Sequence, residues 1–194
     1  MIYQLIGLGL FTIGLGHKLV PTLRLESEIV KFFQDKFSRP PLLKWLEELW
    51  FLGRTTFALI VLFLISGYNW KLGLPALVVF GVVAGLEKIV KMAFNRHRPF
   101  LDDQDIQMLQ PREPIDPSFP SGDALRIWFL VLILSFVFGN SLFLGIIFTI
   151  IAFLISLSRM IFGVHFLTDV LAGTGLGFIG AGTTIWLWQL LHLL

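Results

Sequence analysis

Long apolar runs separated by short polar stretches dominate the order of residues in this chain. A helix that crosses a membrane needs about 20 mostly apolar residues. We expect six membrane-spanning helices, which cover approximately residues Ile2 to Leu23, Leu43 to Ser66, Leu72 to Val90, Gly122 to Phe138, Ser141 to Leu157 and Leu167 to Leu190. The first run is the weakest of these, because His17 and Lys18 interrupt its end.

One charged segment breaks this pattern near the amino terminus. Between Arg24 and Glu48, acidic and basic residues alternate with large apolar ones. Such a mixture is typical of an amphipathic helix lying along a membrane surface. Pro40 and Pro41 interrupt it, since proline does not continue a helix, and mark the turn into the second run. Arg54, inside that run, either extends to the interface or lines a cleft for an anionic headgroup.

Composition supports the same class of protein. The 194 residues are 56% hydrophobic and only 14% charged, and the mean hydropathy of +0.82 is far above that of a soluble domain. We therefore expect an all-α integral membrane bundle that forms one domain over residues 1–194. The net charge of +2 gives no reason to expect a nucleic-acid partner. The absence of cysteine excludes disulfides and thiolate metal sites.

Three polar clusters lie at the ends of the predicted helices. If successive helices alternate in direction, the end of the third, the start of the fourth, the end of the fifth and the start of the sixth meet at one membrane face. The clusters cover residues 91–99, 119–123 and 158–169. Charged groups at the edge of a hydrocarbon layer are costly and are functional by default. The sequence thus predicts one site built from three distant segments.

The first two clusters suit an anion. Lys91, Arg96 and Arg98 lie so close together in sequence that they repel one another unless an anion lies among them. Ser121 and Gly122, after a proline, open a helix whose first N–H groups are free to bind an oxyanion. A lone Pro-Ser-Gly is equally compatible with an ordinary capped helix.

The third cluster supplies candidates for the chemistry. His165 and Asp169 are four residues apart, which places them on one face if a helix begins there. An aspartate that accepts from one imidazole nitrogen fixes the tautomer and leaves the other nitrogen free to attack. Arg159 offers a planar fork of donors to phosphate oxygens. These residue types together indicate phosphoryl transfer without a metal.

The three clusters resemble the motifs of the type 2 phosphatidic acid phosphatases, the PAP2 superfamily of membrane lipid phosphatases. Lys91 with Arg98–Pro99 matches the first motif of this family, and Pro120, Ser121 and Gly122 match the second. The third motif matches throughout, at Ser158, Arg159, Gly163, His165 and Asp169. The resemblance covers roughly the last half of the chain.

This resemblance implies a two-step hydrolysis that uses no cofactor. His165 would attack phosphorus to give a phosphohistidine, and Asp169 would orient the ring. The phosphoryl oxygens would be held by Lys91, Arg98, Ser121, Gly122 and Arg159. The expected substrate is a lipid phosphate monoester or diphosphate, of the phosphatidate or polyprenyl diphosphate type. The expected partners are this lipid and the bilayer, in a plasma or inner membrane.

Asp123 departs from the pattern of the family, which has a histidine at this position of the second motif. In the family that histidine protonates the leaving oxygen, so here the role falls on Asp123 or on no residue. Nearby cations favour the carboxylate, which cannot donate a proton, whereas burial or a bound phosphate dianion favours the acid. Arg126 is placed to pair with Asp123 on the same helix face. If Asp123 is a poor acid, diphosphates should be hydrolysed better relative to phosphatidate, because phosphate leaves more readily than an alkoxide.

Other interpretations stay open at this point. Asp123 could have abolished hydrolysis, leaving a protein that binds or transports lipid phosphates. The vanadate-using haloperoxidases share the phosphate pocket by resemblance, but they are soluble. The positive-inside rule places the site in the cytoplasm, whereas bacterial relatives, by resemblance, usually face the periplasm. His97 either touches substrate or acts as a spacer, and the nearby acidic residues, which form a solvated loop or bind a divalent ion, are Asp102, Asp103 and Asp105.

Overall fold

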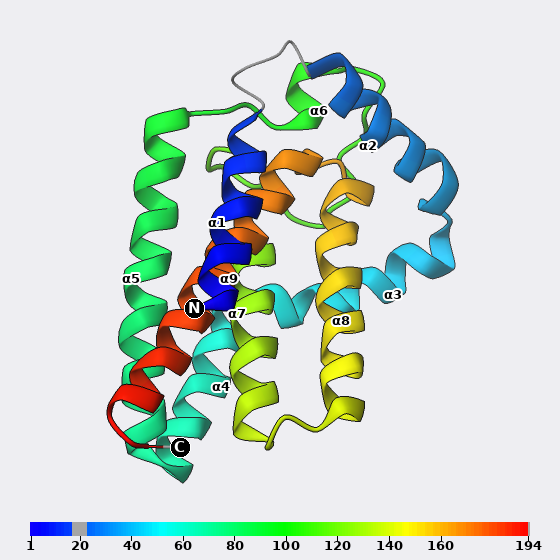
Figure 1. The fold of residues 1–194 in the computed structure, drawn as a ribbon. Helices are drawn as coiled ribbons and strands as arrows, with labels where there is room; N and C mark the ends of the chain where they lie inside the picture. Colours follow the sequence, from blue (N-terminus) through cyan, green and yellow to red (C-terminus); the bar gives the residue numbers. More distant parts are fainter. Residues whose placement is uncertain (17–22, 194) are drawn as a thin grey trace.

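The computed structural model describes residues 1–16 and 23–193, and this part of the chain folds into helices joined by loops, with no strand (Figure 1). The helices are α1 (Ile2–Leu15), α2 (Leu23–Phe37), α3 (Pro40–Trp50), the 3-10 turn η2 (Phe51–Gly53), α4 (Thr55–Tyr68), α5 (Trp70–Phe94), α6 (Pro99–Asp102), α7 (Gly122–Val137), α8 (Leu142–Ile161) and α9 (Leu167–Leu190). The predicted all-α class is confirmed.

Helix α9 forms the centre of the bundle, and most of its residues are buried against α1, α5 and α7. Its glycines allow neighbouring backbones to approach closely. A Cβ atom added at Gly173 would lie 2.1 Å from the carbonyl oxygen of Ser121, and one at Gly177 would lie 2.6 Å from that of Leu125. Small residues at such contacts are typical of helix packing in membranes. They fix the position of α7 against the start of α9.

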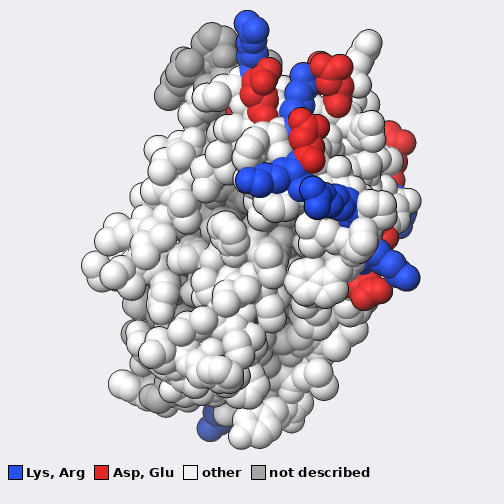
Figure 2. Space-filling view, turned by 90° about the vertical axis from the view of Figure 1, so that its right-hand side faces the viewer, with Lys and Arg blue, Asp and Glu red and all other residues white. Residues whose placement is uncertain are grey.

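The outer surface fits a hydrocarbon layer. Large apolar side chains such as Leu64, Val78 and Phe153 are exposed, and Figure 2 shows the charged side chains gathered toward one end of the visible face. Within the described residues, three helices are long and apolar enough to cross a membrane, or four if the bent pair formed by α3 to η2 and α4 counts as one span. Helix α1, with 14 residues, is shorter. The expected count of six spans therefore stays a prediction.

The second predicted span, Leu43 to Ser66, is wrong as a single helix. The chain bends by 49° between Gly53 and Thr55, and Arg54 between them has extended backbone. Gly53 packs against α7 and α8 at this bend, where an added Cβ atom would lie 3.2 Å from that of Asp123 and 3.1 Å from Ile155. Apolar composition alone does not show such a contact.

The amphipathic segment near the amino terminus has the predicted break. Helix α2 ends at Phe37 and α3 begins at Pro40, whose ring suits the first turn of a helix. Helix α1 ends at Leu15, well before the predicted limit of the first span at Leu23, while His17 and Lys18 lie outside the described residues. Helices α2 and α3 pack against α8, and α2 also contacts α9.

The helix ends converge as the alternating topology predicts. Loop residues 103–121 join α6 to α7 across this end of the bundle (Figure 1). The amide of Leu109 donates to the carbonyl oxygen of Phe162 at 3.1 Å, and that of Ser121 donates to the carbonyl oxygen of Asp169 at 2.9 Å. Gly163, with φ of 70°, makes the turn between α8 and α9. These contacts bring the second and third polar clusters together.

Candidate active site

A small polar cavity of about 160 Å³ lies where the helix ends meet. Its walls come from α3, α5, α7, α8 and the loops between them, at Trp50, Lys91, Arg98, Gln110, Pro114, Asp116, Gly122, Asp123, Arg126, Arg159 and His165. Six of the eight predicted site residues line it directly. Ser121 and Asp169 are fully buried and do not line the cavity.

His165 and Asp169 meet at the start of α9. The carboxylate of Asp169 accepts a hydrogen bond of 2.8 Å from the amide of Phe166, which fixes it in the first helical turn. Its Oδ2 lies 3.6 Å from Nδ1 of His165, which is beyond ordinary hydrogen-bond length. The hydroxyl of Ser118 donates to the same carboxylate oxygen and lies 3.4 Å from Nδ1. Ser118 therefore connects the imidazole to the carboxylate.

The other ring nitrogen of His165, Nε2, lies close to the guanidinium group of Arg98. This nitrogen lies 3.4 Å from Nη1 of Arg98, which also donates to the carbonyl oxygen of Val164 at 2.9 Å. The pKa of His165 is lowered to about 4, chiefly by burial and also by the charge of Arg98. The nearby Asp169 raises this pKa but opposes the lowering only in part. The ring is consequently neutral near pH 7, with a lone pair on one nitrogen.

Asp116, at the mouth of the cavity, binds two of the predicted phosphate ligands. Its carboxylate accepts a hydrogen bond of 2.9 Å from Arg98 and contacts the ammonium group of Lys91. Burial raises the pKa of Asp116, but Lys91 and Arg98 lower it by more, so the net pKa is below its usual value. Sequence reasoning missed this residue, since an acid in a proline-rich loop carries no spacing signal.

Two donors of Arg159 lack a hydrogen-bond partner among the described residues. Its Nη2 donates to Gln110, and its Nε lies 3.1 Å from Oδ2 of Asp123 without hydrogen-bond geometry. Its buried Nη1 has no hydrogen-bond partner in the described part of the chain. A buried donor left unpaired costs about 1–3 kcal/mol. An anion with oxygen acceptors would remove that cost.

Asp123, in the first turn of α7, is surrounded by donors. Oδ1 accepts a hydrogen bond of 2.8 Å from Arg126. Oδ2 accepts a hydrogen bond of 3.1 Å from the indole N–H of Trp50 and also lies near Arg159. The predicted pairing with Arg126 is confirmed. Arg126 also donates to the carbonyl oxygen of Gly53 at 2.8 Å, which holds it in place. Two guanidinium groups and an indole N–H thus favour the ionised carboxylate.

The two remaining residues of the second motif shape the start of α7. The hydroxyl of Ser121 accepts from the amide of Ala124 and so caps the helix. Gly122 lines the cavity, where an added Cβ atom would lie 2.3 Å from Oε1 of Glu87. Only glycine leaves room for the side chains that face this helix start.

A larger open recess of about 490 Å³ adjoins the cavity. The two share several walls, including Trp50, Asp116 and Arg126. Arg54 lines this recess, with its guanidinium group 4.0 Å from the centre of the Trp50 ring. Arg54 therefore lines a recess, and its binding of an anionic headgroup stays a prediction.

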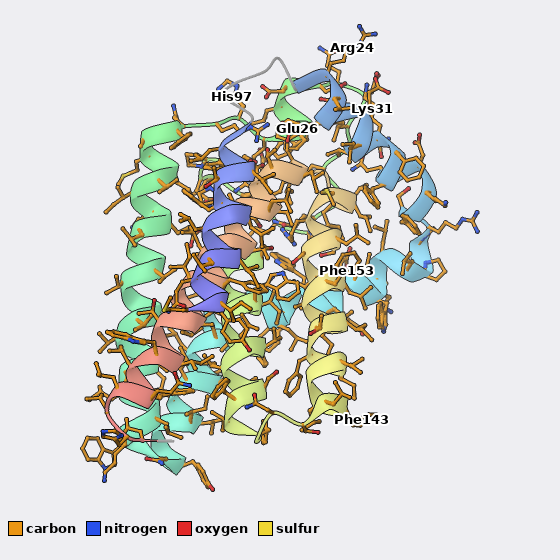
Figure 3. The ribbon with its side chains drawn as sticks, in the orientation of Figure 1. Arg24, Glu26, Lys31, His97, Phe143 and Phe153 are labelled. Carbon is orange, nitrogen blue, oxygen red and sulfur yellow. The ribbon has the colours of Figure 1, made fainter. Side chains whose placement is uncertain are left out.

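His97 and the nearby acidic residues Asp102, Asp103 and Asp105 lie outside the cavity. His97 is 72% exposed and contacts Asp102 at 3.1 Å, so it does not face the site. Asp103 and Asp105 form ion pairs of 2.9 and 3.0 Å with Lys31 of α2. Figure 3 shows Lys31 and His97 toward the same end of the molecule, near α2 and the start of α6.

Fold and site together define a class of protein, namely a multi-pass helical membrane protein with a buried cationic cavity suited to a phosphate group. The sequence profile of the PAP2 superfamily matches residues 72–192. The chain therefore belongs to the PAP2 superfamily, and the resemblance noted from its motifs is confirmed.

Two curated relatives carry phosphatase names, and a third is named as a transport protein. Phosphatidylglycerophosphatase B of Bacillus subtilis is 33% identical over 153 residues, which are 70% of this chain and 71% of that protein. The undecaprenyl-diphosphatase of Sulfolobus acidocaldarius is 33% identical over 60% of this chain and 55% of its own length. The bacitracin transport permease protein BcrC of Bacillus licheniformis is 32% identical over 57% and 53%, respectively.

Solved structures show the same fold. The transmembrane PAP2-type phosphatidylglycerolphosphate phosphatase of Bacillus subtilis superimposes with a TM-score of 0.82 and 25% identity, covering 97% of both chains. LpxE of Aquifex aeolicus superimposes with a TM-score of 0.73 and 26% identity, over 82% of this chain and 93% of its own. The first match extends over both halves of the chain, although the motifs lie in the second half.

Proposed function

We propose that this protein hydrolyses the phosphate group of a membrane lipid through a phosphohistidine formed on His165. The observation that carries the proposal is the environment of this ring, which is buried, neutral and bordered on its Nε2 side by Arg98. A neutral imidazole beside a pocket of guanidinium groups is suited to attack a phosphate bound by them. The named phosphatases among its relatives support the same chemistry.

The proposed first step forms a bond from Nε2 to phosphorus and breaks the bond from phosphorus to the leaving oxygen. Lys91, Arg98, Arg159 and the amide of Gly122 hold the phosphoryl oxygens, whose charge is shared among these donors. Asp169 and Ser118 keep the ring oriented and stabilise its positive charge. Water then attacks phosphorus, and inorganic phosphate and neutral His165 are released. Side-chain cations supply the charge in this scheme, so it needs no metal ion.

We further propose that Asp123 gives no proton to the leaving group. Its oxygens already accept from Arg126 and Trp50 and lie beside Arg159. Protonation would remove at least one of these contacts in a buried site. A diphosphate, whose leaving group is itself a phosphate, should therefore be a better substrate than an alkyl phosphate monoester.

The same observation favours a second candidate function. If the lost histidine is essential for every substrate, the protein would bind or transport lipid phosphates without hydrolysing them. The intact pair of His165 and Asp169 argues for the enzyme, since binding alone requires neither a neutral imidazole nor its orienting carboxylate.

The test is phosphate release by the full chain in detergent micelles, with phosphatidate, phosphatidylglycerophosphate and a polyprenyl diphosphate compared in the presence of a chelator. His165→Ala is the matched blank, because it keeps the cationic pocket. Release by the wild type alone supports the proposal. Lipid-phosphate binding without release by the wild type would favour the second candidate.

A further inference from the structure

Arg96 lies behind the active site rather than in it. It is buried and does not line the cavity. Its Nη1 donates to Oδ1 of Asp169 at 2.7 Å and to the hydroxyl of Thr168 at 2.7 Å. Its guanidinium group lies 4.2 Å from the centre of the Phe166 ring. Arg96 therefore contacts the candidate orienting carboxylate on the side opposite to His165.

Glu26 of α2 completes this arrangement. The side chain is buried, with only 4% of its surface exposed, and its Oε2 accepts from Nη2 of Arg96 at 2.5 Å. Its Oε1 accepts from the amide and the hydroxyl of Thr168, at the start of α9. Figure 3 shows Glu26 on the side of α2 that faces α9, whereas Arg24 points outward. Taking a carboxylate out of water costs desolvation free energy, which these three hydrogen bonds offset.

We infer that Glu26 and Arg96 are positioning residues for the reaction, which hold Asp169 and through it His165 in the reactive geometry. The inference rests on the proposed function, in which His165 is the nucleophile. No motif places Glu26 near the site, since it is 143 positions before Asp169 in the sequence. The charges alternate along the chain of contacts, as carboxylate, guanidinium, carboxylate and imidazole.

The alternation explains why both residues are needed. Arg96 holds Asp169 in place, but its full charge beside Asp169 would weaken the support that this carboxylate gives to a developing imidazolium. Glu26 balances that charge and prevents Arg96 from moving toward the cavity. Without Arg96, the two buried carboxylates Glu26 and Asp169 would lose their common partner.

Other charged groups also act on His165. These are Arg98 before α6, Arg159 in the last turn of α8 and Asp123 in the first turn of α7, together with Asp169 itself. They stay the same in variants of Glu26 and Arg96. A difference between such variants in the pH dependence of the reaction therefore reports the contribution of this pair.

The experiment compares Glu26→Gln, Arg96→Gln and the double variant with the wild type, using phosphate release from a polyprenyl diphosphate between pH 3.5 and 8. Lys31→Gln is the matched control, because it removes the ion pairs of α2 with Asp103 and Asp105, which involve neither Arg96 nor Asp169. We expect kcat to fall about 10-fold in each single variant with KM changed less than twofold, as for other residues that orient a reactive group. Lys31→Gln should match the wild type.

The pH profile separates positioning from a merely structural role. Loss of the Arg96 charge should move the acid limb of kcat/KM to higher pH, loss of the Glu26 charge should not, and the double variant should lie between. Acid limbs that coincide in all active variants, or kcat losses that only follow loss of folded protein on size-exclusion chromatography, would overturn the inference. If Arg96→Gln does not fold, Glu26→Gln alone tests the inference. An unchanged kcat in Glu26→Gln would then overturn the inference. An inactive wild type would instead contradict the proposed function.

Discussion

Helices α7 and α9 begin in a similar way but differ in what their first carboxylate contacts. Each has an aspartate in its first turn, Asp123 in α7 and Asp169 in α9, and each aspartate contacts arginine. Asp169 lies beside an imidazole and accepts from a hydroxyl and a backbone amide. Asp123 contacts two arginines and an indole N–H, and it lines the cavity.

The difference shows that residue type and helix position do not decide a role. At the start of α9, the single arginine is balanced by Glu26, so the negative charge of Asp169 remains available to His165. At the start of α7, Asp123 pairs with Arg126 and lies 3.1 Å from Nε of Arg159, so we expect it to stay ionised. In the proposed mechanism, Asp169 therefore orients the nucleophile, whereas Asp123 holds arginines.

The largest effect is expected from a variant of Asp169, the aspartate at the start of α9. Asp169→Asn keeps the size of the side chain but removes its charge, so both the orientation of His165 and the support for its imidazolium are lost. We expect kcat to fall by about 10³-fold, within the range for general catalytic groups, with little change in KM. Steady-state phosphate release measures it. An activity within tenfold of the wild type would contradict the role given to Asp169.

The next largest effect is expected from a variant of Asp123, the aspartate at the start of α7. Asp123→His restores a group that can donate a proton, and we expect alkyl phosphate monoesters to gain about 10² in kcat/KM while diphosphates gain far less. Rates for a series of phosphate esters with different leaving-group pKa values should depend steeply on that pKa in the wild type and weakly in the variant. Asp123→Asn is the matched control, because an amide removes the charge without supplying an acid. Equal gains on both substrate classes would contradict the assignment of Asp123.

The pH dependence tests the neutral state of His165. Because the pKa of His165 is lowered to about 4, kcat/KM should stay level through neutral pH and fall about tenfold per unit of pH below that value. The unfolded chain binds this proton near pH 6.5, above the folded value, so the contribution to stability is complete above pH 6.5 and is lost as pH falls toward 4. Activity and thermal unfolding between pH 3.5 and 8 check both. An acid limb near pH 6.5 would show an ordinary, unburied imidazole.

The smallest expected effect tests the contact between the two helix starts. Gly173→Ala would place a Cβ atom 2.1 Å from the carbonyl oxygen of Ser121, so α7 and α9 must separate. We expect the free energy of unfolding to fall by about 1–3 kcal/mol, with a severalfold loss of kcat, because the amide of Ser121 bonds to Asp169. Gly9→Ala is the control, since open space surrounds that position. Equal stability of the two variants would show that the helix starts are not closely coupled.

Features carried by local pattern were predictable from the sequence. The bounds of α9, the break before Pro40 and the convergence of the third motif with the first all follow from hydropathy, proline chemistry and alternation of helices. The pairing of Asp123 with Arg126 follows from their spacing of three residues on one helix. The helix bounds, the break and the pairing depend on residues close together in sequence, and the convergence depends on the alternating direction of the helices.

Features that depend on contacts between residues far apart in sequence could not be predicted from it. Glu26 reaches Thr168 across 142 positions, and Trp50 reaches Asp123 across 73, with no spacing rule that relates either pair. The bend at Arg54 depends on how Gly53 packs against α7 and α8, which apolar composition does not show. Asp116 has no motif of its own, although it binds two cations of the site.

The central claim is that His165 becomes phosphorylated during the reaction. Rapid mixing of the enzyme with a labelled lipid diphosphate, followed by quenching in alkali and mass spectrometry of the peptides, measures this directly. The account predicts label on His165 in the wild type, a longer-lived phosphoenzyme when water attack is slowed, and no label in His165→Ala. Label on another residue, or steady release of phosphate with no phosphoenzyme at any time, would contradict it.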